Sequence, residues 1–116
     1  MLLICYPKCT TCQRARKWLD QRGASYTPRD IKEDRPTREE LNAWWKASGL
    51  PLKKFFNTSG NLYKEMHLKD KLPQMSEEEQ LSLLATNGML VKRPLVVGED
   101  FVLTGFKEAE WEQLKK

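Results

Sequence analysis

Two cysteines, Cys9 and Cys12, are separated by two residues near the start of this 116-residue chain. A short apolar run, 1–5, precedes them, and a segment with helical spacing, 13–21, follows. This order predicts a buried strand, a turn that carries the cysteines and a helix that begins at the turn. Amides at the start of a helix lack intrahelical partners and favour a thiolate over a thiol. The spacing therefore predicts redox chemistry at Cys9.

The same sulfur atoms could instead bind a metal. A zinc site needs four ligands, and the remaining candidates are Cys5 and His67. Cys5 lies in the apolar run, where a core position is expected, and His67 is a lone histidine in a predicted surface helix. The spacing of Cys5, Cys9 and Cys12 also fits a radical-SAM cluster motif, but such enzymes need a much larger barrel. We therefore expect no metal.

Composition excludes several classes of protein. The net charge of +4 arises from 20 basic and 16 acidic residues that are interspersed, so we expect no direct binding of nucleic acid. No window approaches the roughly 18 apolar residues of a membrane span, and the N-terminus does not resemble a secretion signal. We expect a cytoplasmic protein with one domain over residues 1–116. Three cysteines are too few for a disulfide scaffold.

Periodicity and capping residues predict an alternation of strands and helices. Thr37-x-x-Glu40 and Ser76-x-x-Glu79 are capping boxes that open helices, which we expect to end at Gly49 and at Asn87-Gly88. Pro28 predicts an edge strand. Further elements are expected as strands at 2–5, 25–31, 94–97 and 101–103, and as helices at 10–21, 52–56, 62–72 and around Phe106, Trp111 and Leu114.

This order predicts an α/β fold with a thioredoxin-like layout. The expected mixed sheet has about four strands, with a helical insertion at about 37–88 between the second and third. Arg93-Pro94 directly precedes the third strand, where thioredoxin-like folds hold a cis-proline facing the cysteine turn. A cis X-Pro bond costs only about 0.5–1 kcal/mol, although a trans proline could also start this strand.

Four segments resemble the arsenate reductase (ArsC) family in its broad sense, which includes the Spx and MgsR regulators. They are Tyr6-Pro-Lys-Cys9-Thr-Thr-Cys12-Gln-Arg-Ala15, Phe56-Asn-Thr-Ser-Gly60, Arg93-Pro-Leu-Val-Val97 and Thr104-Gly-Phe106. The likeness runs from Leu2 to about Leu114. It implies that Cys9 is the nucleophile and that Arg93 faces it. The start of a helix stabilises a thiolate by only about 0.3–1 kcal/mol, at most about 2. A nearby cation is therefore needed as well to hold the Cys9 sulfur mostly as a thiolate.

The resemblance also marks departures from true arsenate reductases. Cys12 matches the second cysteine of Spx-like members, where glutaredoxin-coupled reductases carry a hydroxyl residue. Asn57 and Gly105 stand where two further arginines hold the oxyanion, and Cys5 replaces a histidine. Arsenate reduction is therefore not the expected activity. The residues that the resemblance and the turn suggest for substrate binding are Lys8, Thr10, Thr11, Asn57 and Pro94.

We expect a thiol-dependent oxidoreductase that resembles glutaredoxin-coupled arsenate reductases. Cys9 attacks an oxidised acceptor, Cys12 resolves the intermediate as a disulfide, and a thiol restores the pair. No bound cofactor is expected; the electron donor is glutathione or another thiol, including glutaredoxin or thioredoxin. The alternative is a Spx-like regulator that binds the RNA polymerase alpha subunit. The segment after Gly49, which is acidic in Spx, ends here in Lys53-Lys54, and this favours the enzyme.

Overall fold

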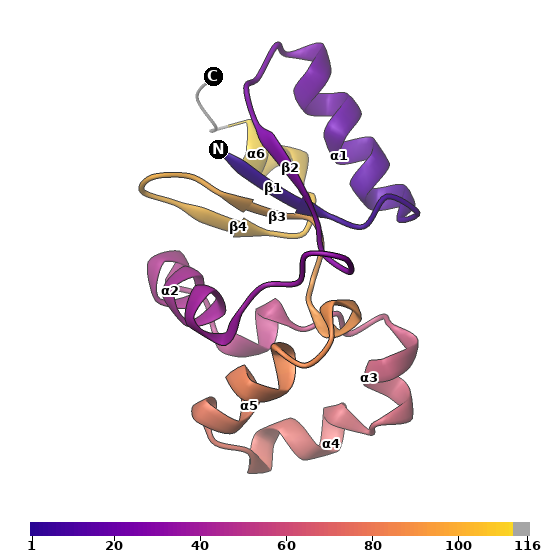
Figure 1. Ribbon diagram of the computed structural model, residues 1–116, viewed down its shortest axis with the longest axis vertical. Helices are drawn as coiled ribbons and strands as arrows, with labels where there is room; N and C mark the ends of the chain where they lie inside the picture. Colours follow the sequence, from indigo (N-terminus) through magenta and orange to yellow (C-terminus); the bar gives the residue numbers. More distant parts are fainter. Residues whose placement is uncertain (113–116) are drawn as a thin grey trace.

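Four short strands form one mixed sheet in the computed structural model, which describes residues 1–112 (Figure 1). Their order across the sheet is β2-β1-β3-β4. The pair β1–β2 is parallel, whereas β3 is antiparallel to both β1 and β4. The predicted α/β, thioredoxin-like class is confirmed. The strands are β1 (Leu2–Cys5), β2 (Thr27–Asp30), β3 (Leu95–Val97) and β4 (Val102–Thr104).

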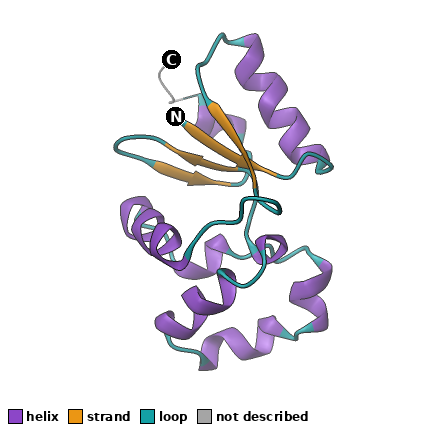
Figure 2. Cartoon of the chain, in the orientation of Figure 1, coloured by secondary structure: helices purple, strands orange, loops and turns teal. Residues whose placement is uncertain are grey.

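Helices cover both faces of the sheet (Figure 2). Helix α1 (Thr10–Gln21) and helix α6 (Glu108–Trp111) pack on one face, and the predicted insertion between β2 and β3 packs on the other. Successive side chains of a strand point to opposite faces. Leu3 and Cys5 therefore join the buried cluster of α1, while Ile4 joins that of the insertion.

Helix α1 packs as its sequence predicts. Its buried residues, Cys12, Ala15, Trp18 and Leu19, form one stripe that faces the sheet. Trp18 also makes an edge-to-face contact with Trp111 of α6, at 5.9 Å between ring centroids. These contacts fix the height of α1 above β1, and with it the position of the cysteine turn.

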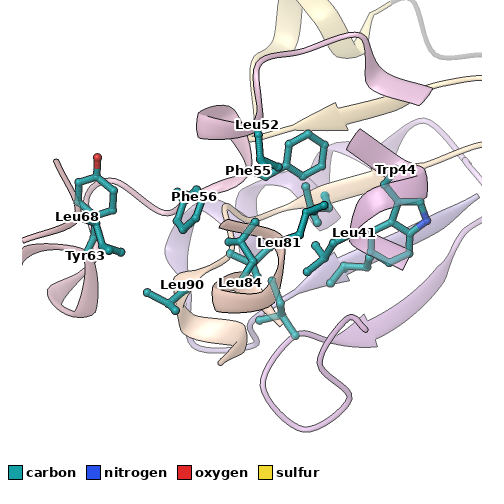
Figure 3. Close-up of a cluster of buried hydrophobic side chains, with 14 of the residues drawn as sticks. Leu41, Trp44, Leu52, Phe55, Phe56, Tyr63, Leu68, Leu81, Leu84 and Leu90 are labelled. Atoms are coloured by element: carbon teal, nitrogen blue, oxygen red, sulfur yellow. The ribbon is translucent and has the colours of Figure 1, made fainter. Parts of the chain in front are cut away.

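The insertion is a second hydrophobic cluster, and Figure 3 shows its side chains converging from several helices. Both predicted capping boxes are present, at Thr37 and at Ser76, and Gly49 ends α2 with φ +70°. The helical elements are α2 (Arg38–Ser48), η1 (Leu52–Phe55), α3 (Asn61–Glu65), α4 (Leu68–Lys71), η2 (Leu72–Gln74), α5 (Glu77–Leu84) and η3 (Gly88–Leu90), where η marks a 3-10 helix.

The predicted helix at 62–72 is wrong in one respect. His67 adopts φ +53° and splits the segment into α3 and α4. The break lets Tyr63 and Leu68 both reach the insertion core, because positions five apart on a straight helix do not share a face. Tertiary packing thus overrides the local helical pattern.

Several predicted boundaries also shift. The second strand is limited to Thr27–Asp30, at the sheet edge that Pro28 predicted. Helix α5 ends at Leu84, because Asn87 instead caps η3 by accepting a hydrogen bond from the Met89 N–H (2.9 Å). The last two strands begin one residue later than expected, at Leu95 and Val102. Leu114, expected in the last helix, lies outside the described residues.

A bidentate ion pair ties the edge strand to the insertion. Arg29 of β2 donates from Nη1 and Nη2 to the two carboxylate oxygens of Glu40 in α2, at 2.7 and 2.8 Å. The same guanidinium donates from Nε to the Asp34 carbonyl (2.9 Å). These bonds hold the chain where it leaves the sheet for α2.

Replacing Glu40 by Gln tests this pair. Arg29 lowers the pKa of Glu40 to about 2. Since this value lies below that of an unfolded glutamate, about 4.3, the pair stabilises the fold above about pH 4.5 and loses its effect as the pH falls toward 2. The Glu40 side chain is 35% exposed, so we expect a loss of only about 1–2 kcal/mol in urea unfolding at pH 7. Glutamine keeps the capping box.

The exposed neighbour Glu39 provides the matched control. Glu39→Gln should leave the free energy of unfolding within about 0.5 kcal/mol of the parent value at pH 7 and at pH 2. A loss on Glu40→Gln that is as large at pH 2 as at pH 7 would contradict the assigned ion pair.

Candidate redox site at the start of the first helix

Cys9 is the N-cap residue of α1, as predicted. The turn before it is closed by the Cys9 N–H, which donates to the Tyr6 carbonyl (2.9 Å), and the Cys9 carbonyl accepts from the Gln13 N–H (3.0 Å). The side chain is half-buried. The Cys9 side chain makes no capping hydrogen bond. Sulfur is a weak acceptor, so the helix acts on Cys9 through its dipole.

Cys12 lies one helical turn further along and is buried, with 1% of its surface exposed. Its Sγ accepts a hydrogen bond from the Tyr6 N–H at 3.4 Å. The neighbouring Cys5 side chain and burial raise the pKa of Cys12 far above its usual range, although the Tyr6 N–H and the Cys9 side chain act in the opposite direction. At neutral pH Cys12 is therefore a thiol.

The third cysteine, Cys5, is buried as predicted and contacts Cys12. All three cysteines are free. The ligands that a zinc site would need are not brought together, since His67 lies exposed between α3 and α4. Within residues 1–112, no group of three or more His, Cys, Asp or Glu side chains is arranged to hold a metal ion. No helix in that range has the length and apolarity to cross a membrane.

Arg93 lies at the same end of the sheet as the cysteine turn. The Arg93-Pro94 peptide bond is cis, as the thioredoxin-like layout predicted. Leu95 pairs with Ile4 in the antiparallel register, so the chain just before Leu95 lies beside the chain just after β1. The Arg93 guanidinium lies 5.3 Å from the centre of the Tyr6 ring. Its buried Nε and Nη1 have no hydrogen-bond partner among the described residues, although buried polar groups normally have one.

The other predicted site residues fall into two groups. Lys8 and Thr10 are exposed beside Cys9, Thr11 is half-buried, and Pro94 is buried. The Pro94 carbonyl accepts a hydrogen bond from the Gly105 N–H (2.8 Å), which joins the third and fourth strands near the cis bond.

Asn57 belongs to a different arrangement. It follows Phe56, which forms an isolated bridge with Val91, and its N–H donates to the Leu90 carbonyl (2.7 Å). Its side chain folds against Gly60, where an added Cβ would lie 2.7 Å from Nδ2. Asn57 thus shapes its own turn.

Two features were missed from the sequence. Tyr6 was not chosen, because its contribution comes from its backbone and its ring face. A basic cavity of about 430 Å³ was also not predicted, because its lining comes from segments that are distant in the sequence. Its lining contains no acidic residue; it consists of Pro51, Lys53, Lys54, Phe56, Thr58, Lys92, Thr104 and Lys107. Four of these residues directly adjoin Asn57, Arg93 or Gly105 in the sequence, and this adjacency was the available signal.

The burial pattern predicts which cysteine reacts first. Trypsin cleavage after Lys8 and Arg14 separates Cys5 from the pair, giving peptides 1–8 and 9–14. We expect iodoacetamide near pH 7 to add one label to peptide 9–14 of the native chain and none to peptide 1–8, because Cys5 and Cys12 are almost fully buried. Cys9→Ala should remove that label. Equal labelling of peptide 1–8 would contradict the described burial.

Comparisons with known proteins agree with this geometry. The ArsC family model matches residues 5–114. "Uncharacterized protein YusI" of Bacillus subtilis is 54% identical over 108 residues, covering 93% of this chain and 92% of its own. "Regulatory protein MgsR" of the same organism is 27% identical over 111 residues, covering 96% and 86%. A crystal structure of an ArsC family related protein from Bacteroides fragilis superposes with a TM-score of 0.96 at 64% identity, covering 98% and 96%. The chain belongs to the ArsC family.

Proposed function

We propose that this chain is a thiol-dependent oxidoreductase in which Cys9 is the nucleophile and Cys12 the resolving cysteine. One observation carries the proposal. A half-exposed sulfur stands at the N-cap of α1 and packs against the buried cluster that holds a second thiol, Cys12, one helical turn further along. Cys9 can meet a substrate from solvent, whereas Cys12 reacts only with what Cys9 has bound.

The cycle balances as a transfer of two electrons. The Cys9 thiolate attacks one sulfur of a substrate disulfide; a Cys9–substrate bond forms and the other half leaves as a thiolate. The Cys12 thiol passes its proton to that departing thiolate, and its sulfur attacks Cys9 Sγ. The second half leaves, and the chain holds a Cys9–Cys12 disulfide. A thiol donor then returns two electrons by the same exchange chemistry.

The surroundings of Cys12 suit its role as the resolving cysteine. Burial and the Cys5 thiol keep it protonated, so it does not compete with Cys9 for substrate. When Cys12 begins to lose its proton, the Tyr6 N–H at 3.4 Å is already in place to stabilise the developing negative charge. The same backbone group therefore lowers the cost of the second step without activating Cys12 at rest.

Arg93 supplies the cation of the proposed site. Its two buried nitrogens without partners suit an anionic group, either the Cys9 thiolate or a carboxylate of the substrate. We assign substrate contacts to the residues that surround Cys9 and the cis bond, namely Lys8, Thr10, Thr11 and Pro94, and to Asn57 as the family position implies.

The structure disfavours arsenate as the substrate. Asn57 and Gly105 stand where the family resemblance places arginines. Gly105 has φ +73°, a conformation that an arginine would adopt only with strain. Arg93 remains, and one arginine is a weak cradle for a multiply charged oxyanion. A disulfide or a mixed disulfide with an acidic thiol such as glutathione is the better candidate.

A regulatory role is the second candidate, and MgsR is the relative that favours it. In a Spx-like regulator the disulfide is a switch and the RNA polymerase alpha subunit is the partner. Here Lys53 and Lys54 are exposed in the segment that is acidic in Spx, and a change of sign alters partner choice. We therefore rank the enzyme first. Glutathione, glutaredoxin and thioredoxin, our proposed donors, would meet it in the cytoplasm, where thiols stay reduced.

Mass spectrometry of peptide 9–14 tests the cycle. Soon after reduced chain is mixed with oxidised glutathione and quenched with acid, we expect this peptide about 2 Da lighter, as one disulfide requires. Cys12→Ser should stop the reaction at Cys9 bound to glutathione. With a thiol donor in excess, the chain should reduce many equivalents of disulfide. Oxidation that halts after one equivalent per chain would favour the switch, and no disulfide at all would refute the pair.

The cation is tested by the alkylation rate of Cys9. We expect Arg93→Ala to slow labelling of Cys9 near pH 7 by about three- to tenfold, because loss of a nearby positive charge lowers the thiolate fraction. Arg93→Lys should retain part of the rate. Lys46→Ala removes the same charge from an exposed position on α2 and should leave the rate within about twofold. An unchanged rate in Arg93→Ala would remove Arg93 from the site.

A further inference from the structure

A third sulfur adjoins the pair and has no part in the cycle above. Cys5 ends β1 on the face that packs against α1, in the same buried cluster as Cys12. The two side chains are 4% and 1% exposed. Cys12 therefore has two thiol neighbours, the half-exposed Cys9 and the buried Cys5.

Backbone geometry brings Cys12 close to Cys5. Cys12 Sγ lies 3.4 Å from the Tyr6 nitrogen, and that nitrogen is two bonds, of about 1.33 and 1.52 Å, from the Cα of Cys5. Cys12 Sγ is therefore no more than about 6.3 Å from this Cα, which places it next to the Cys5 residue. Both side chains belong to one buried cluster beneath α1, and the effect of the Cys5 side chain, which raises the pKa of Cys12, agrees with their being neighbours there.

We propose that Cys5 is a second disulfide partner of Cys12: once the Cys9–Cys12 disulfide has formed, Cys5 exchanges into it and leaves a buried Cys5–Cys12 disulfide and a free Cys9. This inference rests on the proposed function, which supplies the first disulfide.

The exchange conserves atoms and electrons. The Cys5 sulfur attacks Cys12 Sγ, and the Cys5–Cys12 bond forms as the Cys9–Cys12 bond breaks. Cys9 leaves with the electron pair and accepts the proton that Cys5 releases, so the chain remains oxidised by two electrons. Cys9 is the better leaving group of the two, because its half-exposed position at a helix start tolerates negative charge.

The step has a functional consequence. Cys9 regains its nucleophilic sulfur while the oxidising equivalents are held where neither partner is exposed by more than 4%. A small thiol cannot reach that disulfide directly and must act after the reverse exchange has returned it to Cys9. The chain would thus store oxidation in its core and release it only through the surface cysteine.

Tryptic mapping of the unmodified chain tests the exchange without a variant. Reduced chain is oxidised with one equivalent of oxidised glutathione, quenched with acid at increasing times, alkylated and digested. A Cys9–Cys12 disulfide stays within peptide 9–14 and leaves Cys5 alkylated. A Cys5–Cys12 disulfide joins peptide 1–8 to peptide 9–14 and leaves Cys9 alkylated. We expect the joined peptides to grow over minutes as the internal disulfide declines, to about a third or more of the oxidised chain.

Native labelling of the oxidised chain gives a second readout. Iodoacetamide added before the quench should label Cys9 in the oxidised parent, but not in oxidised Cys5→Ala, where the sulfur stays in the Cys9–Cys12 disulfide. Thermal unfolding of reduced Cys5→Ala checks that the variant folds.

The outcomes separate the two proposals. If the Cys9–Cys12 disulfide is the only one found at every time, the exchange is overturned and the proposed cycle stays intact. Joined peptides whose fragments place the bond at Cys9 would also overturn it. If neither disulfide is detected at any time, both the cycle and the exchange are refuted.

Discussion

The backbone of Tyr6 is the constraint on which the site depends. Its N–H donates to Cys12 Sγ, its carbonyl accepts from the Cys9 N–H, and its ring lies beneath the Arg93 guanidinium. One residue after β1 therefore positions both proposed redox sulfurs and the proposed cation. Because side chains alternate along a strand, a slip of β1 by one residue would turn Cys5 toward the insertion. The burial of Leu3 and Ile4 on opposite faces prevents that slip.

The same constraint explains why two similar cysteines differ. Both lie within one turn at the start of α1, yet Cys9 is half-exposed and Cys12 is sealed beneath the helix. A buried thiolate is costly unless it is hydrogen-bonded, and the backbone donor to Cys12 Sγ is the Tyr6 N–H. That donor does not offset burial and the adjacent Cys5 thiol, so Cys12 stays neutral until a reaction at Cys9 draws its proton away.

Local signals predicted most elements and failed where distant contacts decide. The capping boxes at Thr37 and Ser76 and the glycine at position 49 act within one turn of helix, so the sequence alone was sufficient. The split at His67 depends on which side chains the insertion core accepts, and periodicity does not contain that information. The role of Tyr6 could not be predicted for a related reason. It lies in the backbone N–H and carbonyl groups, and the residue type does not indicate what these groups bind. The resemblance identified Arg93 and its cis proline, whereas the contact between Cys5 and Cys12 required the fold.

The distribution of positive charge supports a substrate larger than an oxyanion. A compact oxyanion is held best by guanidinium groups that converge on it with paired donors. Arg93 is one such group beside Tyr6, and we propose that Asn57 and Gly105 stand where the family resemblance places the others. Four lysines, Lys53, Lys54, Lys92 and Lys107, line a cavity of about 430 Å³, and lysines are point charges on flexible stems. Dispersed point charges suit a ligand whose own charges are separated, such as a peptide thiol with several carboxylates.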